Sequence, residues 1–365
     1  MNDLASAIYR RPELAKRYLD RLLNSPNRAL SIFGPRQTGK TTLLQNDLVE
    51  LAQHAGLTPL YVDFMATTNS LELLNSRLAQ LVQGAKMALS KRRVKSASVA
   101  GFGVGLEEYP TDPSSTDHGV QLQNHFAALN RLKPGVRIVL MLDEAQELTK
   151  LKDGEATMKS VRALFNTFQG QLLLLITGSS REGLLRLFGD RHRASFGLAD
   201  HEDFQRLGRD FVEAKSQAFN KQRRKPIDID LLNEAFQAME HRPADFIGFL
   251  EFLAVNDIRD VPASVQVFLK SRYPQSVVTD RFEAYTPLQQ ALLRLMAAGV
   301  VQLTAKTTLD KVGAAIGGTI SASGIRNALT TLPPDVVTNP GRGIYDIVDV
   351  QLLAWLKESA LLGSE

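Results

Sequence analysis

Apolar residues along the first 200 positions follow two alternating patterns. Short continuous apolar runs predict buried strands at residues 29–33, 59–64, 137–142 and 172–176. Between these runs, apolar residues at helical spacing predict helices at residues 3–24, 41–55, 69–89, 120–132 and 159–168. Strands that alternate with helices predict an α/β fold, with a parallel sheet covered by helices on both faces.

The pattern changes near residue 200, where the strand signals end. Helical spacing continues at residues 204–219, 230–240 and 244–256. The last 80 residues contain three helical segments and then two strand-like runs around a turn, at residues 287–298, 307–315, 321–332, 335–338 and 344–348. Three helices followed by a hairpin are typical of a winged helix-turn-helix.

These changes predict the domain organisation. We expect an N-terminal helical segment over residues 1–28, an α/β core over 29–200, a helical region over 201–280 and a winged helix over 281–365. Within the core, apolar residues interspersed with glycines predict a hairpin insert near residues 94–108.

Composition excludes several classes of protein. The 365 residues are 44% hydrophobic and 22% charged, as in ordinary globular proteins, and the absence of cysteine excludes disulfides, thiolate metal sites and a cysteine nucleophile. No apolar run approaches the roughly 18 residues that span a bilayer, and the N-terminus lacks the apolar stretch of a secretory signal. We therefore expect a cytoplasmic protein with no membrane partner. A net charge of +4 permits a nucleic-acid partner but does not argue for one.

The sharpest chemical signal follows the first predicted strand. Residues 34–41 fit the pattern G-x-x-x-x-G-K-[ST], in which backbone N–H groups and a helix N-terminus surround phosphate oxygens. In this pattern Lys40 reaches the β and γ phosphates and Thr41 ligates Mg²⁺. The alternative interpretation is a glycine-rich turn that binds no ligand. The residues predicted to bind the nucleotide here are Gly34, Pro35, Arg36, Gln37, Thr38, Gly39, Lys40, Thr41 and Thr42.

Two carboxylates follow the strand at 137–142. Functional groups of parallel sheets lie beyond the carboxyl ends of the strands, so Asp143 is predicted to hold Mg²⁺ and Glu144 to act on the attacking water. A base beside the metal carboxylate favours hydrolysis by water over a small-molecule kinase. The alternative is an acidic surface turn.

Polar groups after the strand at 172–176 are further candidates. Ser179 is the first choice, and Ser180 the second, for a contact with the γ-phosphate or the lytic water; a helix cap explains either serine equally well. Arg191 and Arg193 precede the predicted end of the core and are candidates for acting on a neighbouring subunit's nucleotide. Their alternative is an exposed basic turn.

Together these motifs resemble the archaeal-ATPase family within the AAA+/STAND P-loop NTPases. The likeness lies in Gly34–Leu44, in an "LDE-x-Q-x-L" motif at 142–148, in a "GSS" motif at 178–180, and in the end of the winged helix. The resemblance implies a P-loop ATPase core, a helical lid and a C-terminal winged helix, with ATP and Mg²⁺ as cofactors.

The family adds two weaker site predictions. An Arg-Glu-x-x-hydrophobic segment covers the adenine in the family, and here Arg11 is its better match, although Pro12 interrupts the pattern. The family's lid often has a "G-x-P" motif near the nucleotide, and the corresponding segment here contains Arg242 and Pro243. Glu240 departs from the pattern because it replaces the glycine. Pro243 is also explained as the first residue of a helix.

The distribution of charged residues does not decide whether the protein binds DNA. Residues 285–365 contain six Lys or Arg and six Asp or Glu, so the winged helix is neutral and poorly suited to bind DNA alone. Basic clusters at Lys91–Lys95 and Lys221–Lys225 either line a DNA path in an oligomer or form solvated faces.

The sequence therefore predicts a Mg²⁺-dependent ATPase that acts as a conformational or assembly switch. We expect ATP-dependent homo-oligomers and a protein partner of unknown identity. Two alternatives remain: a winged-helix DNA-binding regulator in which nucleotide is structural, and a small-molecule kinase.

Overall fold

The computed structural model describes residues 8–100, 117–189, 191–221, 223–333, 336–341 and 344–362. The chain divides into two compact units, the first ending at Phe211 and the second beginning at Val212. Among the helices so described, none is long and apolar enough to cross a membrane.

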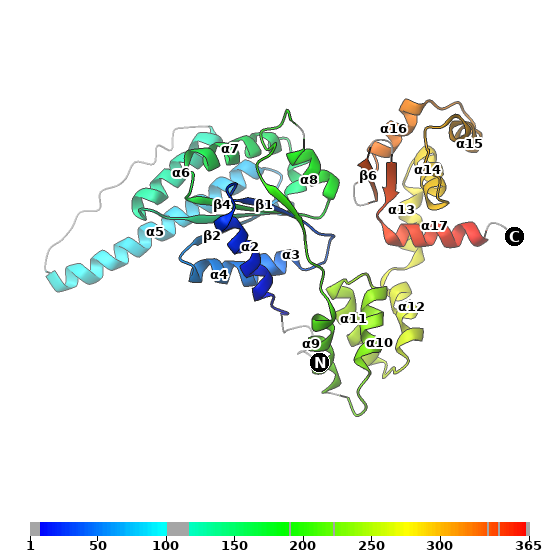
Figure 1. The fold of residues 1–365 in the computed structure, drawn as a ribbon, viewed down its shortest axis with the longest axis horizontal. Helices are drawn as coiled ribbons and strands as arrows, with labels where there is room; N and C mark the ends of the chain where they lie inside the picture. Colours follow the sequence, from blue (N-terminus) through cyan, green and yellow to red (C-terminus); the bar gives the residue numbers. More distant parts are fainter. Residues whose placement is uncertain are drawn as a thin grey trace. The chain divides into compact units, whose positions relative to one another are not determined.

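A five-stranded parallel sheet forms the centre of the first unit, in the order β2-β3-β4-β1-β5 (Figure 1). Four strands confirm the sequence prediction: β1 (Ala29–Phe33), β2 (Thr58–Asp63), β3 (Ile138–Asp143) and β4 (Leu172–Gly178). Every residue of β3 and β4 is buried, which explains their uninterrupted apolar runs.

Helices cover both faces of this sheet, as predicted. One face packs against α5 (Ser70–Ala100), α6 (His118–Leu132), α7 (Gly154–Thr167) and α8 (Arg181–Phe188). The other packs against α2 (Pro12–Asn24) and the helical segment that follows β1. Alternate residues of β3 serve the two faces: Leu140 and Leu142 face α5–α8, and Val139 and Met141 face α2.

The helix after β1 begins at the phosphate-loop lysine. It consists of α3 (Lys40–Thr42), a π-helical stretch over Leu43–Leu48, and α4 (Val49–His54). This confirms the predicted helix, but its periodicity did not reveal the wider turn. Single π-helical turns inside helices are frequent at functional sites.

The fifth strand, β5 (Asp200–Asp203), was missed by the sequence analysis. Its residues are Asp, His, Glu and Asp, so no apolar pattern marks it. Among the described strands it pairs with β1 alone and lies at the edge of the sheet, and an edge tolerates charged side chains because it has one strand neighbour.

The hairpin predicted near 94–108 is wrong for the part that the structure describes. α5 continues through Ala100, because lysine, arginine and alanine between 91 and 100 are good helix formers. The remainder of the predicted hairpin lies outside the described residues.

The second unit is helical apart from one hairpin. Its first group of helices is α9 (Arg209–Asn220), α10 (Ile229–Ala238), α11 (Pro243–Val255) and α12 (Val261–Arg272). Phenylalanines join these helices, including Phe249 of α11 against Phe268 of α12. These elements confirm the helical region predicted after residue 200.

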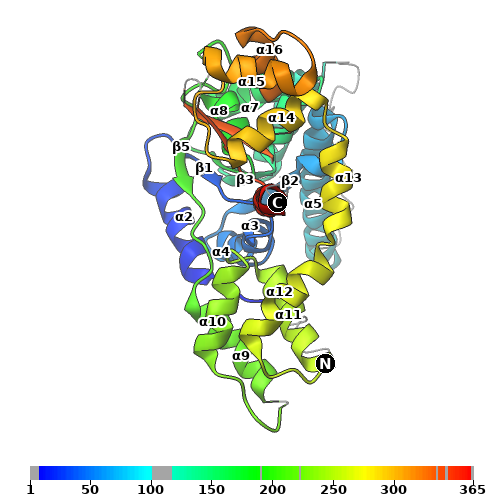
Figure 2. The ribbon, with the colours of Figure 1, turned by 90° about the vertical axis from the view of Figure 1, so that its right-hand side faces the viewer.

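The last elements are the three predicted helices and hairpin, preceded and followed along the chain by a further helix. They are α13 (Gln275–Glu283), α14 (Pro287–Ala297), α15 (Lys306–Ile316), α16 (Ala322–Thr330), β6 (Val337–Gly341), β7 (Ile344–Ile347) and α17 (Val350–Leu362). Figure 2 labels α13, α14, α15 and α16 among them. Phe282 of α13 packs in the same apolar cluster as Leu292 and Leu352. The predicted boundary at residue 280 therefore falls inside a helix that packs with the C-terminal elements.

Candidate nucleotide-binding site

The phosphate loop runs from the end of β1 to the start of α3. The backbone N–H of Gly34 donates to the Gly178 carbonyl of β4 at 3.1 Å, which ties the loop to the neighbouring strand. A Cβ at position 34 would lie 2.6 Å from Phe204 Cβ, so only glycine fits there. Gly39 has a φ of 93°, a conformation that glycine adopts without strain.

Lys40 lies inside this loop and is only 4% exposed. Its ammonium donates to the carbonyl of Gly34 at 2.7 Å and of Pro35 at 2.9 Å. Burial lowers the pKa of Lys40, and the nearby Glu144 and Asp143 carboxylates oppose that shift. The lysine is thus held among the loop carbonyls, where the motif predicts the β and γ phosphates to bind.

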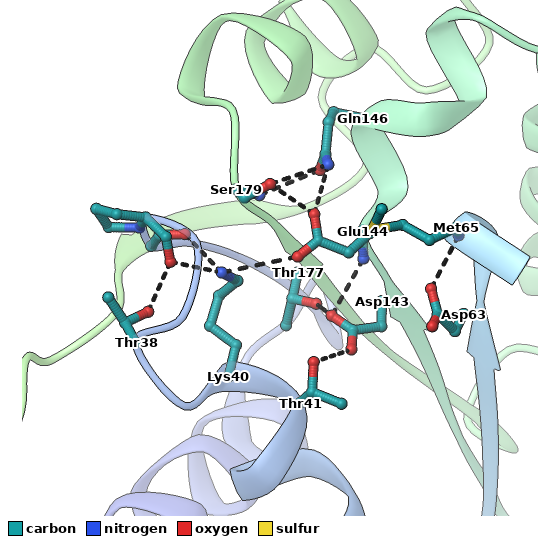
Figure 3. A network of polar contacts seen from close by, with 12 residues as sticks. Thr38, Lys40, Thr41, Asp63, Met65, Asp143, Glu144, Gln146, Thr177 and Ser179 are labelled. Carbon is teal, nitrogen blue, oxygen red and sulfur yellow. Dashed lines mark hydrogen bonds and ion pairs between the residues drawn. The ribbon is translucent and has the colours of Figure 1, made fainter. Parts of the chain in front are cut away.

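Asp143 is buried at the carboxyl end of β3 and accepts four hydrogen bonds. Thr41 Oγ1 donates to its Oδ2 at 2.7 Å, and the Tyr61 hydroxyl donates to the same oxygen at 2.9 Å. Thr177 Oγ1 and the Glu144 N–H donate to Oδ1. The structure therefore brings together Thr41 and Asp143, the pair predicted to hold Mg²⁺ (Figure 3).

This donor set suits magnesium. Mg²⁺ in nucleotide sites is bound by one or two protein groups and completes its shell with phosphate oxygens and water. A hydroxyl and a carboxylate side by side fit that requirement. Among the described residues, no cluster of three or more His, Asp or Glu forms an all-protein metal site.

Three residues around Asp143 were missed by the sequence analysis. Tyr61 and Asp63 come from β2, where Asp63 pairs in register with Asp143, and Thr177 comes from β4. Burial raises the pKa of Asp63, and the Asp143 and Glu144 carboxylates raise it further. Burial beside Asp143 also raises the pKa of Tyr61. The sequence does carry one signal for these three residues: each lies near the carboxyl end of a strand, and these strand ends meet at one edge of the sheet.

Glu144 has a left-handed backbone conformation, with φ at 51°. Its Oε1 lies 3.8 Å from Lys40 Nζ. Its Oε2 accepts hydrogen bonds from Gln146 Nε2 at 2.5 Å and from Ser179 Oγ at 2.6 Å. The predicted base and the predicted third-strand serine are therefore in direct contact (Figure 3).

The two serine candidates have different roles in the structure. Ser180 caps α8, because its Oγ accepts a hydrogen bond from Gly183 N at 3.0 Å. Ser179 is the one that faces the acidic pair. A contact between Ser179 and phosphate stays a prediction.

Arg10 and Arg11 come directly before α2 and have different contacts. Arg10 forms ion pairs with Asp47 at 2.5 Å and Glu50 at 2.6 Å on the helix after the phosphate loop. The Arg11 guanidinium lies over the ring of Phe204, 5.1 Å from its centroid, and its buried Nη1 has no hydrogen-bond partner. Phe204 lies next to Gly34 of the phosphate loop, whereas Arg10 is held in ion pairs, so Arg11 is the better of the two candidates, and its contact with the nucleotide stays a prediction.

The other predicted arginines are placed as follows. Arg191 is exposed, and Arg193 Nη1 lies 3.3 Å from Glu155 Oε2 of α7. Arg242 and Pro243 belong to the second unit, where Pro243 is the first residue of α11 and Arg242 Nε lies 3.4 Å from the buried Asp245. The helix-start explanation of Pro243 is thereby confirmed.

The predicted basic clusters are only partly available for binding. The side chains of Lys91–Lys95 lie outside the described part of the chain. Arg223 turns inward: its guanidinium donates to the carbonyls of Leu253 and Ile258 and packs on Phe219. Arg224 and Lys225 are exposed.

The sheet order, the loop and the Thr41–Asp143 pair define a P-loop nucleotide-binding domain. Residues 23–185 match the family model of the AAA domain. This match agrees with the AAA-type P-loop NTPase domain that the resemblance implies for the core. Among curated proteins, none matches the chain.

Solved structures share the fold. The Walker-type ATPase of Pyrococcus abyssi is 17% identical, with 95% of each chain covered and a TM-score of 0.62. The ORC2 protein of Aeropyrum pernix, in its ADP form, is 13% identical, with 98% of this chain and 97% of that chain covered and a TM-score of 0.55. Both likenesses support the α/β core followed by a helical C-terminal region.

Proposed function

We propose that the protein binds ATP with Mg²⁺ and hydrolyses it to ADP and phosphate. The contact between Thr41 Oγ1 and Asp143 Oδ2, beside the buried Lys40, is the observation that carries this proposal. This contact joins a residue of the phosphate-loop motif to a residue of the acidic motif, as Mg²⁺ binding between the two motifs requires.

The chain's own residues have separable roles in this reaction. Lys40 and the loop N–H groups bind the β and γ phosphates. Thr41 and Asp143 hold Mg²⁺, which when bound offsets the charge of the phosphates. Glu144 orients the attacking water and accepts its proton. Arg11, on Phe204, is proposed to contact the base of the nucleotide.

The output of hydrolysis is proposed to be conformational. The motifs of the described core are all directed at the nucleotide, and the chain has a separate helical unit on which a change of state can act. DNA or a partner protein is proposed as the target. The neutral charge of residues 285–365 favours a protein contact for the winged helix, whereas the exposed Lys221, Arg224 and Lys225 of the second basic cluster favour DNA.

The test separates nucleotide binding from turnover. Glu144→Gln is expected to retain the affinity for a fluorescent ATP analogue and to release phosphate about 10²–10⁴-fold more slowly, because an amide cannot accept the proton. Glu72→Gln, an exposed glutamate at the start of α5, is the matched control and should behave as wild type. Wild-type phosphate release by Glu144→Gln would refute the assignment of the base.

A further inference from the structure

Gln146 connects the acidic motif with the end of the third strand. Its Nε2 donates to Glu144 Oε2 at 2.5 Å and to Ser179 Oγ at 3.1 Å. The Ser179 hydroxyl in turn donates to the same Glu144 oxygen at 2.6 Å. The three side chains therefore form a closed ring of hydrogen bonds around one carboxylate oxygen (Figure 3).

The amide of Gln146 is itself fixed from both sides. Its Oε1 accepts the backbone N–H of Ser179 at 3.1 Å, which determines which way the amide faces. The side chain is 3% exposed and fills a slot made by two glycines. A Cβ at Gly178 would lie 2.6 Å from Gln146 Oε1, and one at Gly183 would lie 2.4 Å from Gln146 Cβ.

This ring leaves the two oxygens of Glu144 in different situations. Oε2 is occupied by two donors, whereas Oε1 points toward Lys40 Nζ, 3.8 Å away. A carboxylate held by one oxygen cannot rotate freely, so its other oxygen is presented in one direction. Positioning of this kind contributes to catalysis because a misplacement of about 1 Å costs on the order of 10² in rate.

We propose that Gln146 is a positioning residue for Glu144. It holds Oε2 together with Ser179, so that Oε1 is the atom offered to the attacking water, and it links the orientation of the base to the strand end that carries Ser179. This inference rests on the proposed ATPase function.

A purely structural role for Gln146 predicts something different. If the side chain only fills its slot, its loss lowers stability and impairs catalysis independently of Glu144. If it acts through Glu144, its loss has no further effect once Glu144 cannot act as a base. A double-mutant cycle separates the two roles.

The experiment compares Gln146→Leu, Glu144→Gln and the double variant in single-turnover ATP hydrolysis. We expect Gln146→Leu to lower the rate constant about 10- to 100-fold, with an unchanged dissociation constant for a fluorescent ATP analogue. In the Glu144→Gln background, we expect the same change to have less than a twofold effect. Gln171→Leu is the matched control, since Gln171 is a half-buried glutamine at the opposite end of β4 whose amide donates to Asn130.

Two results would overturn the inference. One is a wild-type rate for Gln146→Leu; the other is an equal fold-loss in both backgrounds. If Gln146→Leu does not fold, Gln146→Met, whose unbranched side chain has nearly the same length, replaces it in the same cycle. Failure of the proposed function is distinguishable, because then Glu144→Gln alone would hydrolyse ATP at the wild-type rate.

Discussion

At the scale of single residues, two glycines leave the space in which Gln146 lies beside Glu144. Gly183 lies on α8, directly against the Cβ of Gln146, and Gly178 ends β4 against its amide oxygen. The absence of side chains at these positions creates the slot in which Gln146 reaches Glu144. The glycines therefore act on the base indirectly, by the space that they leave.

Gly183→Ala is expected to reduce ATP turnover. A Cβ 2.4 Å from Gln146 Cβ forces that side chain to move, and overpacking of this kind typically costs about 1–3 kcal/mol. Steady-state phosphate release and thermal unfolding measure the two effects. The control is Gly84→Ala on α5, where an added Cβ meets nothing within 4 Å and alanine is the better helix former. Equal turnover by both variants would show that the slot tolerates a methyl group.

Sequence reasoning identifies residues whose role depends on a local motif. Lys40 and Thr41 follow from the spacing of one loop, and Asp143 and Glu144 from the end of one apolar run. Tyr61 and Thr177 could not be identified in this way, because their contact with Asp143 depends on the order and register of three strands. The hydrogen bonds between Gln146 and Ser179 likewise depend on tertiary structure, because Ser179 follows the end of β4.

At the scale of whole elements, α11 and α12 are joined by a buried charge. Asp245 on α11 is fully buried, and Arg272 Nε and the Tyr273 hydroxyl each donate to its Oδ1 at 2.7 Å. Burial raises the pKa of Tyr273, and the hydrogen bond to Asp245 raises it further. This carboxylate thus holds together the end of α12 and the start of α11, where Arg242 also lies.

Asp245→Asn is expected to destabilise the second unit by about 2 kcal/mol, less than the full penalty of breaking a buried pair because Arg272 is partly exposed. Urea unfolding followed by the fluorescence of Trp355, the chain's one tryptophan, reports on this unit. Asp257→Asn is the control, since Asp257 is 85% exposed and pairs with Arg223 only at 3.5 Å. Equal stability of the two variants would contradict a structural role for Asp245.

Elements with strong periodicity were predicted well, and two others were not. The buried strands carry continuous apolar runs, and α14–α16 carry helical spacing, so their positions agree with the structure. β5 has no apolar residue, and its pairing with β1 is a tertiary effect that no local pattern encodes. The end of α5 differs from the predicted hairpin because residues 91–97 have a high helix propensity, whereas the hairpin prediction rests on the glycines that follow.

At the scale of the whole molecule, we predict ATP-dependent self-association that accelerates ATP hydrolysis. Arg191 is exposed beyond the third motif, and Arg193 is half-buried against Glu155 of α7. An exposed arginine there is available to the nucleotide site of a neighbouring copy, and an arginine supplied in this way increases hydrolysis about 10³–10⁵-fold where it operates. The isolated chain should then hydrolyse ATP slowly, and its specific activity should rise with protein concentration.

Mixing inactive variants tests this dependence directly. Glu144→Gln subunits lack the base but keep their arginines, whereas subunits with both Arg191→Ala and Arg193→Ala keep the base. A mixture should regain part of the wild-type turnover, because one variant lends its arginine to the site of the other. Arg186→Ala, which alters an exposed arginine on α8, should retain full activity as the control. If specific activity is constant over a hundredfold dilution and mixing restores no turnover, the active unit is a monomer, and Arg191 and Arg193 contribute only surface charge.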